Sequence, residues 1–306
     1  MRRVRSLIGA VLSVAVLIAV LATTDLGPAV GALATVTPLR IAAGLGLLLI
    51  RDILADVSLW RSALAWAGFR VRYRDLLRVY VEFTPLKFLL PFKLGDAARV
   101  VALRTRLGVP AAWGGATRLV AMAAQSAAFV VLAAGLAAMA RGTWWPAMLG
   151  VAGVVIIAAT TVIVLRRRGR SEAPGDGALG GAPTAAVLVR GWPHAAQACA
   201  FAILAAGAEI GLFALFVGPA LGRSLDPATL AVIAATALAC HLPLSARGVG
   251  VRELLLTTAV AAVAEGNAAT LLGAGLAISA IEIGFVLALA AGFAVFRMIG
   301  LVRSSR

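Results

Sequence analysis

Apolar stretches of the length that crosses a lipid bilayer follow one another along the chain. A transmembrane helix needs about 20 consecutive apolar residues, and stretches that meet or approach this length occupy residues 6–24, 40–66, 111–140, 145–165, 194–217, 228–244 and 268–296. Hydrophobic residues make up 62% of the chain and charged residues 13%, whereas soluble domains average about 45–50% and about 25%. The sequence therefore predicts an all-α, polytopic membrane helix bundle and excludes a water-soluble globule.

Two further segments, at residues 79–104 and 243–265, are apolar but interrupted. In the first, Pro85 and Pro91 prevent one continuous helix, because proline lacks the N–H that an interior helical residue donates. Irregular backbone at membrane depth is tolerated only where protein buries it or water reaches it. We expect a re-entrant hairpin at 79–104, and the alternative is an interfacial loop whose lysines reach the lipid headgroups.

Arginines mark one side of the predicted membrane. The loops at 25–38, 141–144 and 218–227 carry few charges, whereas arginines gather at Arg2 to Arg5, Arg70 to Arg78, Arg99 to Arg106, Arg166 to Arg170 and Arg297 to Arg306. Because arginine-rich loops stay in the cytoplasm, both termini are expected there, in a multi-pass protein of the cell (inner) membrane. A full crossing by segment 243–265 keeps the C-terminal arginines inside and gives about eight crossings.

The two halves of the chain contain related segments. A Gly/Pro-rich cytoplasmic linker at 166–192 separates a first membrane repeat, 1–165, from a second, 193–306. Each repeat has a Leu-Pro pair, a short glycine-containing stretch, and then an acid close to an arginine, in Leu90 to Arg99 and in Leu242 to Glu253. Interrupted segments at corresponding positions of two halves point to the binding site of a transporter. We therefore expect two inverted repeats around one site.

The interrupted segments carry the residues that we expect to bind a phosphate. In the first, Lys87, Lys93 and Arg99 would face the anion, with Glu82 and Asp96 as counter-charges. In the second, Gly248 and Gly250 precede a helix that begins near Arg252, and N–H groups at a helix start bind anions. The alternative is a cytoplasmic turn with an ordinary surface pair of Arg252 and Glu253.

Further charges lie inside the apolar stretches, where they usually face the bundle interior and pair. Asp52 and Asp56 form an acidic stripe at the i, i+4 spacing, next to Arg51. These three residues fit a structural ion pair as well as a role in transport. The remaining charges are Arg118, Glu209 and Glu282, and we expect the two glutamates to be partners of Arg118 or proton carriers.

No motif for a catalytic nucleophile, a metal or a nucleotide occurs in the sequence. We therefore expect no enzyme activity, no metal and no cofactor. The net charge of +15 does not indicate nucleic-acid binding, since basic residues at the ends of membrane spans already account for it.

Two motifs carry a resemblance to a known family. The segment Pro91-x-x-x-Gly95-Asp96-x-x-Arg99, followed by a span with Arg118, resembles the first motif of the flippase-like integral membrane family. That family includes the transmembrane region of lysylphosphatidylglycerol synthase and the flippase half of the multiple peptide resistance factor. Pro243-Leu244-Ser245 together with Gly248-Val249-Gly250-Val251-Arg252-Glu253 resembles the second motif of that family, a proline, a glycine-rich turn and G-x-R-E.

The resemblance implies a lipid translocase with re-entrant elements around a cavity. It implies site roles for Asp96, Arg99, Arg118, Gly250, Arg252 and Glu253. Arg247 and Lys87 depart from the family pattern and add positive charge, which favours a strongly anionic headgroup such as a polyprenyl phosphate-sugar. The family's soluble aminoacyl-transfer domain is missing, so lysyl transfer is not expected.

The sequence thus predicts a translocase for an anionic phospholipid or a polyprenyl-phosphate-linked lipid. Its partners would be the membrane and the lipid, with a homodimer left open. The alternatives are an accessory subunit of lipid or cell-envelope biosynthesis that transports nothing, and a membrane-embedded glycosyltransferase. The predicted headgroup-binding residues are Lys87, Lys93, Asp96, Arg99, Arg118, Gly250, Arg252 and Glu253.

Overall fold

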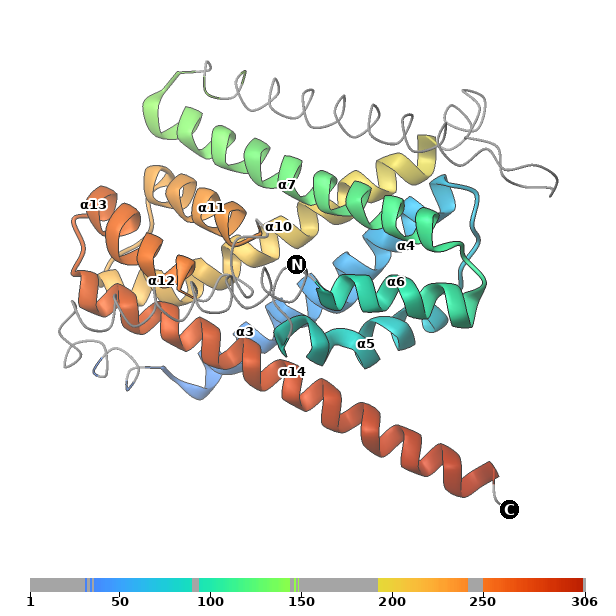
Figure 1. Cartoon of the computed structure of the whole chain (residues 1–306). Helices are drawn as coiled ribbons and strands as arrows, with labels where there is room; N and C mark the ends of the chain where they lie inside the picture. The colour runs from blue at the N-terminus through green and yellow to red at the C-terminus, as the bar shows by residue number, and fades with distance from the viewer. Residues whose placement is uncertain are drawn as a thin grey trace, which may run out of the picture.

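A computed structural model describes residues 36–89, 94–143, 192–241 and 250–304, together with Gly31, Ala34, Pro146 and Met148. All the elements in these ranges are helices, as predicted (Figure 1). The predicted spans at 6–24 and 145–165 lie outside this part of the chain, apart from Pro146 and Met148. The linker up to residue 191, Lys93 and Arg247 also lie outside it.

The predicted span at 40–66 is one uninterrupted helix made of α3, η1 and α4. Thr37 begins it, because its side-chain oxygen accepts a hydrogen bond from the Arg40 N–H at 3.3 Å and proline follows at the first helical position. The middle of this helix is a π-helix that carries three of the predicted charges. The bounds are α3 Pro38–Leu48, η1 Leu49–Asp56 and α4 Val57–Trp66.

The interrupted segment at 79–104 lies in two helices, α5 (Tyr73–Leu89) and α6 (Leu94–Leu107). The two helices pack against each other, so the chain doubles back between them, as predicted (Figure 1). Pro85 does not interrupt the helix as expected, because α5 continues through it to Leu89, and Pro91 lies outside the described residues. A turn at Gly108 leads into α7 (Ala111–Arg141). This helix is closed by Gly142, whose φ of 61° is the left-handed conformation that ends many helices.

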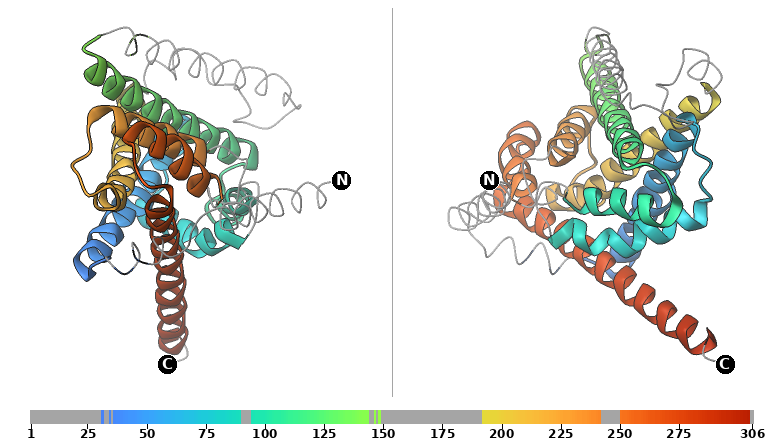
Figure 2. Two further views of the ribbon diagram at one scale, coloured as in Figure 1. Left: turned by 90° about the vertical axis from the view of Figure 1, so that its left-hand side faces the viewer. Right: turned by 45° about the vertical axis from the view of Figure 1, so that its right-hand side comes forward.

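The second half begins with α10 (Trp192–Leu221) and α11 (Pro227–His241). The next helix starts after Gly250 and continues without a break through α12 (Val251–Leu255), the π-helix η2 (Leu256–Val260) and α13 (Ala261–Ala264). The last helix is α14 (Ala268–Ser304), whose C-terminal part projects beyond the other described helices in all views (Figures 1 and 2).

Three of the helices are long and apolar enough to cross a membrane: Ala111–Arg141, Pro193–Leu221 and Ala268–Phe293. Pro227–His241 is apolar but shorter. These helices support the prediction of a membrane protein. The number of crossings, the orientation and the inverted repeats stay predictions.

Helix α10 lies at the centre of the bundle and packs against α3, η1, α4, α7, α11 and α14. Its aromatic residues Phe213 and Phe216 are buried in the main core, with Phe129 of α7. Small residues let neighbouring helices approach, which is typical of membrane bundles. A Cβ atom on Gly275 of α14, for example, would lie 3.3 Å from Glu253 Cγ.

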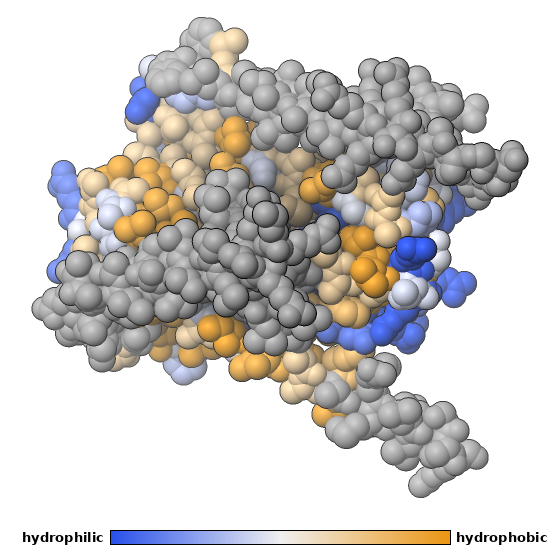
Figure 3. Space-filling view, in the orientation of Figure 1, coloured by the Kyte–Doolittle hydropathy of each residue, from blue (hydrophilic) through white to orange (hydrophobic). Residues whose placement is uncertain are grey.

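The described surface in Figure 3 divides into polar ends and an apolar middle. Hydrophilic residues gather where α5 begins and α6 ends, and a smaller group lies near α13. Large apolar side chains such as Met139, Leu287 and Val101 are exposed. Exposed apolar side chains on long helices fit a surface that faces lipid rather than water.

Candidate functional site

Ten charged side chains are buried among the described residues. A charge at the centre of a membrane costs about 2.5–3.5 kcal/mol on insertion scales, so such residues are rare and commonly functional. Here they form two clusters, one on each side of the π-helix η1. The ten are Arg51, Asp52, Asp56, Asp96, Arg99, Arg118, Glu209, Arg252, Glu253 and Glu282.

The first cluster, here called the Arg118 cluster, joins α5, α6 and α7 to η1. Arg118 holds both oxygens of Asp56, with Nη1 at 2.7 Å from Oδ1 and Nη2 at 3.1 Å from Oδ2. Its Nε lies 3.3 Å from Oδ1 of Asp96, which also accepts a hydrogen bond from Arg99 Nη1 at 3.1 Å. Among the described residues, two arginines therefore face two aspartates, and their formal charges balance.

Two residues of α5, Tyr80 and Thr84, complete the Arg118 cluster. The Tyr80 hydroxyl donates to Asp56 Oδ2 at 2.6 Å, and the guanidinium of Arg99 lies 3.7 Å from the centre of the Tyr80 ring. Thr84 Oγ1 accepts a hydrogen bond from Arg99 Nη2 at 2.7 Å and donates to the Tyr80 carbonyl. The spacing of four residues places both on the same face of α5.

The second cluster, here called the Arg252 cluster, joins η1, α10, α12 and α14. Nη1 of Arg51 is shared by two carboxylates, Glu209 Oε2 at 2.5 Å and Glu282 Oε1 at 2.7 Å. Nη2 of Arg51 holds Asp52 Oδ2 at 2.9 Å. The other oxygen of Glu282 accepts a hydrogen bond from Arg252 Nη2 at 2.8 Å. Glu282 therefore bridges two arginines.

Ser279 and Glu253 continue this cluster to the start of α12. Ser279 Oγ accepts from Arg252 Nη1 at 3.0 Å and donates to Glu253 Oε1 at 2.9 Å. Oε2 of Glu253 accepts the backbone N–H of Gly250 at 2.7 Å, as a residue three positions into a helix often does. Gly250 has a φ of 84°, which favours glycine. The sequence predicted that N–H groups at this helix start would bind an external anion. The Gly250 N–H instead donates to the protein's own Glu253 carboxylate.

Charge is unequal in the Arg252 cluster. Among the described residues, two arginines face four carboxylates, those of Asp52, Glu209, Glu253 and Glu282. Removing one partner of a buried ion pair typically costs about 3–5 kcal/mol, since the other charge stays uncompensated. The position of each buried charge therefore depends strongly on its neighbours.

The π-helix η1 connects the two clusters. It contributes Arg51 and Asp52 to the Arg252 cluster and Asp56 to the Arg118 cluster. The two aspartates lie about one turn apart along the helix axis, so each reaches a different cluster. Single π-helical turns occur frequently at functional sites. Motion of this helix would therefore affect both clusters together.

Three buried arginines each have one N–H group that finds no hydrogen-bond acceptor among the described residues. These atoms are Nε of Arg99, Arg118 and Arg252. Arg118 Nε lies within ion-pair distance of Asp96, but not in hydrogen-bond geometry. Almost all buried donors in proteins are bonded to protein or ordered water, so each exception calls for a ligand, a water or a functional role.

The structure brings most of the predicted site residues together, in two groups. Asp96, Arg99 and Arg118 meet in the first cluster, and Gly250, Arg252 and Glu253 meet in the second. Lys87 lies on α5, where its side chain is not described. Glu82, expected as a counter-charge, pairs with Arg106 through Oε1 and Nη2 at 2.7 Å at the polar end of the hairpin.

The expected partners of the intramembrane glutamates were wrong. Glu209 and Glu282 hold Arg51 and Arg252, whereas Arg118 holds Asp56. Sequence reasoning also missed the polar groups that orient the arginines, Tyr80, Thr84 and Ser279. The spacing of Tyr80 and Thr84, and of Ser279 and Glu282, was a signal, because each pair shares one helix face.

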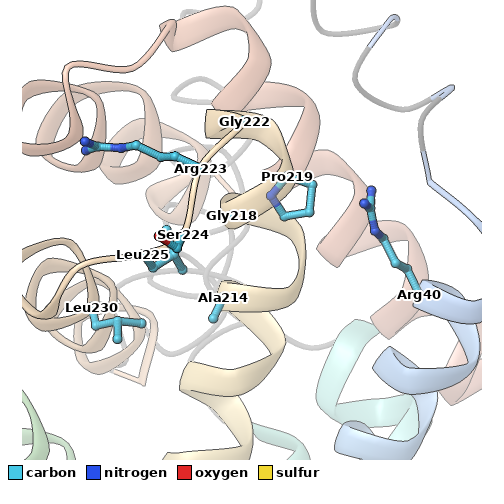
Figure 4. Close-up of a pocket in the computed structure, with 9 residues that line it drawn as sticks. All are labelled: Arg40, Ala214, Gly218, Pro219, Gly222, Arg223, Ser224, Leu225 and Leu230. Carbon is cyan, nitrogen blue, oxygen red and sulfur yellow. The ribbon is translucent and has the colours of Figure 1, made fainter.

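An open hollow of about 670 Å³, drawn in Figure 4, shares no lining residue with the two clusters. It is lined mainly by apolar residues at the end of α10 and the start of α11, with Arg40 and Arg223 on opposite sides. Arg223 donates to the Ala264 carbonyl at 2.9 Å. None of the predicted headgroup residues whose side chains the structure describes lines this hollow. No group of three potential metal ligands occurs among the described residues.

Comparison of the chain with protein-family models and with curated proteins finds no match. The functional interpretation therefore rests on the sequence motifs and on the geometry of the two clusters.

Proposed function

We propose that the protein is a lipid translocase that moves an anionic phospholipid or a polyprenyl-phosphate-linked lipid between leaflets. The observation that carries this proposal is the set of buried arginines Arg99, Arg118 and Arg252, each with an Nε donor that has no partner among the described residues. Arg99 and Arg252 lie within the two interrupted segments, and Arg118 lies on α7, the helix that follows the first of them. A guanidinium is the side chain best suited to hold a phosphate, since its N–H groups form a planar fork.

The carboxylates around these arginines explain how such a site would stay closed without lipid. Asp96, Asp56 and Glu282 occupy the Nη groups that a phosphate would otherwise use. An incoming phosphate would exchange with a carboxylate, so that no arginine is left uncompensated in the membrane. An exchange of this kind gives weak, reversible binding, which suits a carrier that must release its lipid.

The proposed translocase also has a defined orientation in the membrane. The exposed arginines Arg70, Arg72, Arg74, Arg78 and Arg104 gather where α5 begins and α6 ends. We propose that this end faces the cytoplasm, with about eight crossings and two inverted repeats in the full chain. The headgroup would then enter between the α5–α6 hairpin and the start of α12.

Leaflet transfer in reconstituted vesicles tests the translocase. The purified protein would be reconstituted with fluorescent phosphatidylglycerol, and the fraction of label accessible to an external quencher would be followed over time. Wild-type protein should transfer the label. Arg99→Ala and Arg252→Ala should reduce the rate by at least about tenfold, the effect of losing one charge-assisted contact of about 1.4 kcal/mol.

The matched control is Arg223→Ala, an arginine outside both clusters that should leave transfer unchanged. Arg252→Lys keeps the charge but loses the fork, and it should also transfer slowly. This variant separates lost binding from lost folding when the alanine variants unfold. Equal rates in wild type and all arginine variants would contradict a role of the clusters. Wild-type protein that transfers no label would favour the accessory subunit.

A further inference from the structure

We propose that binding of a lipid phosphate to Arg252 is coupled to the uptake of a proton by Glu282. This inference rests on the proposed translocase and adds its source of energy. It would make the transport of an anionic lipid dependent on a proton gradient.

One edge of the Arg252 guanidinium is available to a phosphate. Nε–H and one Nη2–H point in the same direction from a guanidinium and together form a fork for two phosphate oxygens. Nε of Arg252 is buried and has no hydrogen-bond partner among the described residues, whereas Nη2 is held by Glu282 at 2.8 Å. Nη1 is engaged separately by Ser279. A phosphate that binds this edge therefore displaces Glu282.

The displaced Glu282 carboxylate would lose part of its compensating positive charge. Glu282 is 3% exposed, so water does not replace the lost contact. Its other described cation is Arg51, which already holds Asp52 and Glu209. A guanidinium shared by three carboxylates compensates each of them less than a dedicated partner does.

The described acidic groups near Glu282 act together to disfavour its ionised form. Besides the two arginines, the described charged or titratable groups of this cluster are carboxylates and one thiol, contributed by η1, α10, α11 and α12. They are Asp52, Glu209, Cys240 and Glu253. Burial and nearby negative charges both favour the protonated form of a carboxyl group. The phosphate also adds a negative charge close to Glu282.

The exchange is balanced without any covalent step. Two hydrogen bonds form between the phosphate and Nε and Nη2 of Arg252, the Glu282 contact with Nη2 breaks, and a proton from water neutralises the Glu282 carboxylate. When the lipid leaves, Glu282 loses the proton and binds Arg252 again. Lipid and proton therefore enter the site together and leave it together.

Titration calorimetry tests the coupling without any transport. A short-chain phosphatidylglycerol is the probe, because its phosphodiester does not change charge near neutral pH. Binding to the detergent-solubilised full-length protein would be measured in two buffers of different ionisation enthalpy. We expect uptake of about one proton per bound lipid, and an affinity that falls about tenfold per unit rise in pH above the titration of the coupled group.

Glu282→Gln supplies the variant arm. The amide cannot take up a proton, so the lipid should still bind, with proton uptake close to zero and little dependence on pH. The matched control is Glu265→Gln, which removes an exposed carboxylate in the turn before α14 and should behave like wild type. If Glu282→Gln does not fold, the two-buffer comparison on wild type decides.

The outcomes separate this inference from the proposed function. Wild-type protein that binds the lipid with no proton uptake and no pH dependence would overturn the coupling and leave the translocase intact. The same uptake in Glu282→Gln as in wild type would also overturn it, because another group would then carry the proton. Wild-type protein that does not bind the lipid would overturn the proposed function and the coupling together.

Discussion

At the scale of single residues, the arginines of this chain divide into two kinds. The buried ones, such as Arg51 and Arg118, each hold one or more carboxylates. The exposed arginines at the end of the α5–α6 hairpin make no side-chain ion pair or hydrogen bond to any residue that the structure describes; they are Arg70, Arg72, Arg74, Arg78 and Arg104. Composition alone treats both kinds as one excess of positive charge. Their surroundings separate the arginines of the proposed site from those that mark topology.

Asp226 provides a prediction at this scale. Its carboxylate accepts the Thr229 N–H at 2.7 Å at the start of α11, and this hydrogen bond lowers the pKa of Asp226 below its usual value. Asp226→Ala should lower the melting temperature in detergent by about 2–4 °C at neutral pH. Tryptophan fluorescence during heating measures the shift.

The pH dependence follows from the lowered pKa. A carboxyl group with a lower pKa in the folded state stabilises the protein above its unfolded pKa, and this contribution is lost as pH falls through the folded pKa. The difference between wild type and Asp226→Ala should therefore shrink on acidification. Asp226→Asn keeps the acceptor and should stay near wild type at neutral pH. A difference that grows on acidification would contradict this cap.

At the scale of elements, the close packing of α14 against α12 positions the Arg252 cluster. A Cβ atom on Gly275 would lie 3.2 Å from Leu256 Cδ1 and 3.3 Å from Glu253 Cγ. Ser279 and Glu282 follow on the same helix and reach Arg252 across this interface. The approach of the two helices therefore determines whether these contacts form.

Gly275→Val tests this packing. The added side chain should push α14 away from α12, slow leaflet transfer by at least about tenfold and lower the melting temperature, since overpacking typically costs about 1–3 kcal/mol. The matched control is Gly284→Val on the same helix, where no atom lies within 4 Å of the added Cβ. Equal transfer by the two variants would show that the packing at Gly275 does not position the cluster.

The elements were largely predictable from the sequence, and the contacts within the clusters were not. Apolar length predicted the long helices, and the prediction of a break within 79–104 was right, since α5 ends at Leu89 and α6 begins at Leu94. Pro85 does not make this break, because α5 continues through it. The partner of Arg118 could not be predicted, because it depends on which helices contact each other. Helix η1 supplies Asp56 to Arg118, whereas Glu209 on α10 and Glu282 on α14 contact Arg51. The π-helical turns were also missed, since hydrophobic spacing does not distinguish them from α-helix over so few residues.

At the scale of the whole molecule, the two ends of the bundle differ in charge. The unpaired arginines lie at the end where α5 begins and α6 ends. The loop between α10 and α11 instead pairs Arg223 with Asp226 at 3.7 Å. Because loops rich in Lys and Arg stay on the cytoplasmic side and Arg223 is the one basic residue of the segment 218–227, the α10–α11 loop is expected on the opposite side of the membrane.

Cysteine labelling tests this orientation in intact cells. In a background that lacks Cys199 and Cys240, Thr105→Cys places a thiol beside Arg104 on α6, and Ser224→Cys places one in the α10–α11 loop. Both positions are exposed and neither change alters the net charge. A maleimide that does not cross membranes should label the loop cysteine at once and the α6 cysteine only after permeabilisation, because the arginines keep that end inside. The reverse pattern, or equal labelling of both before permeabilisation, would contradict the proposed orientation.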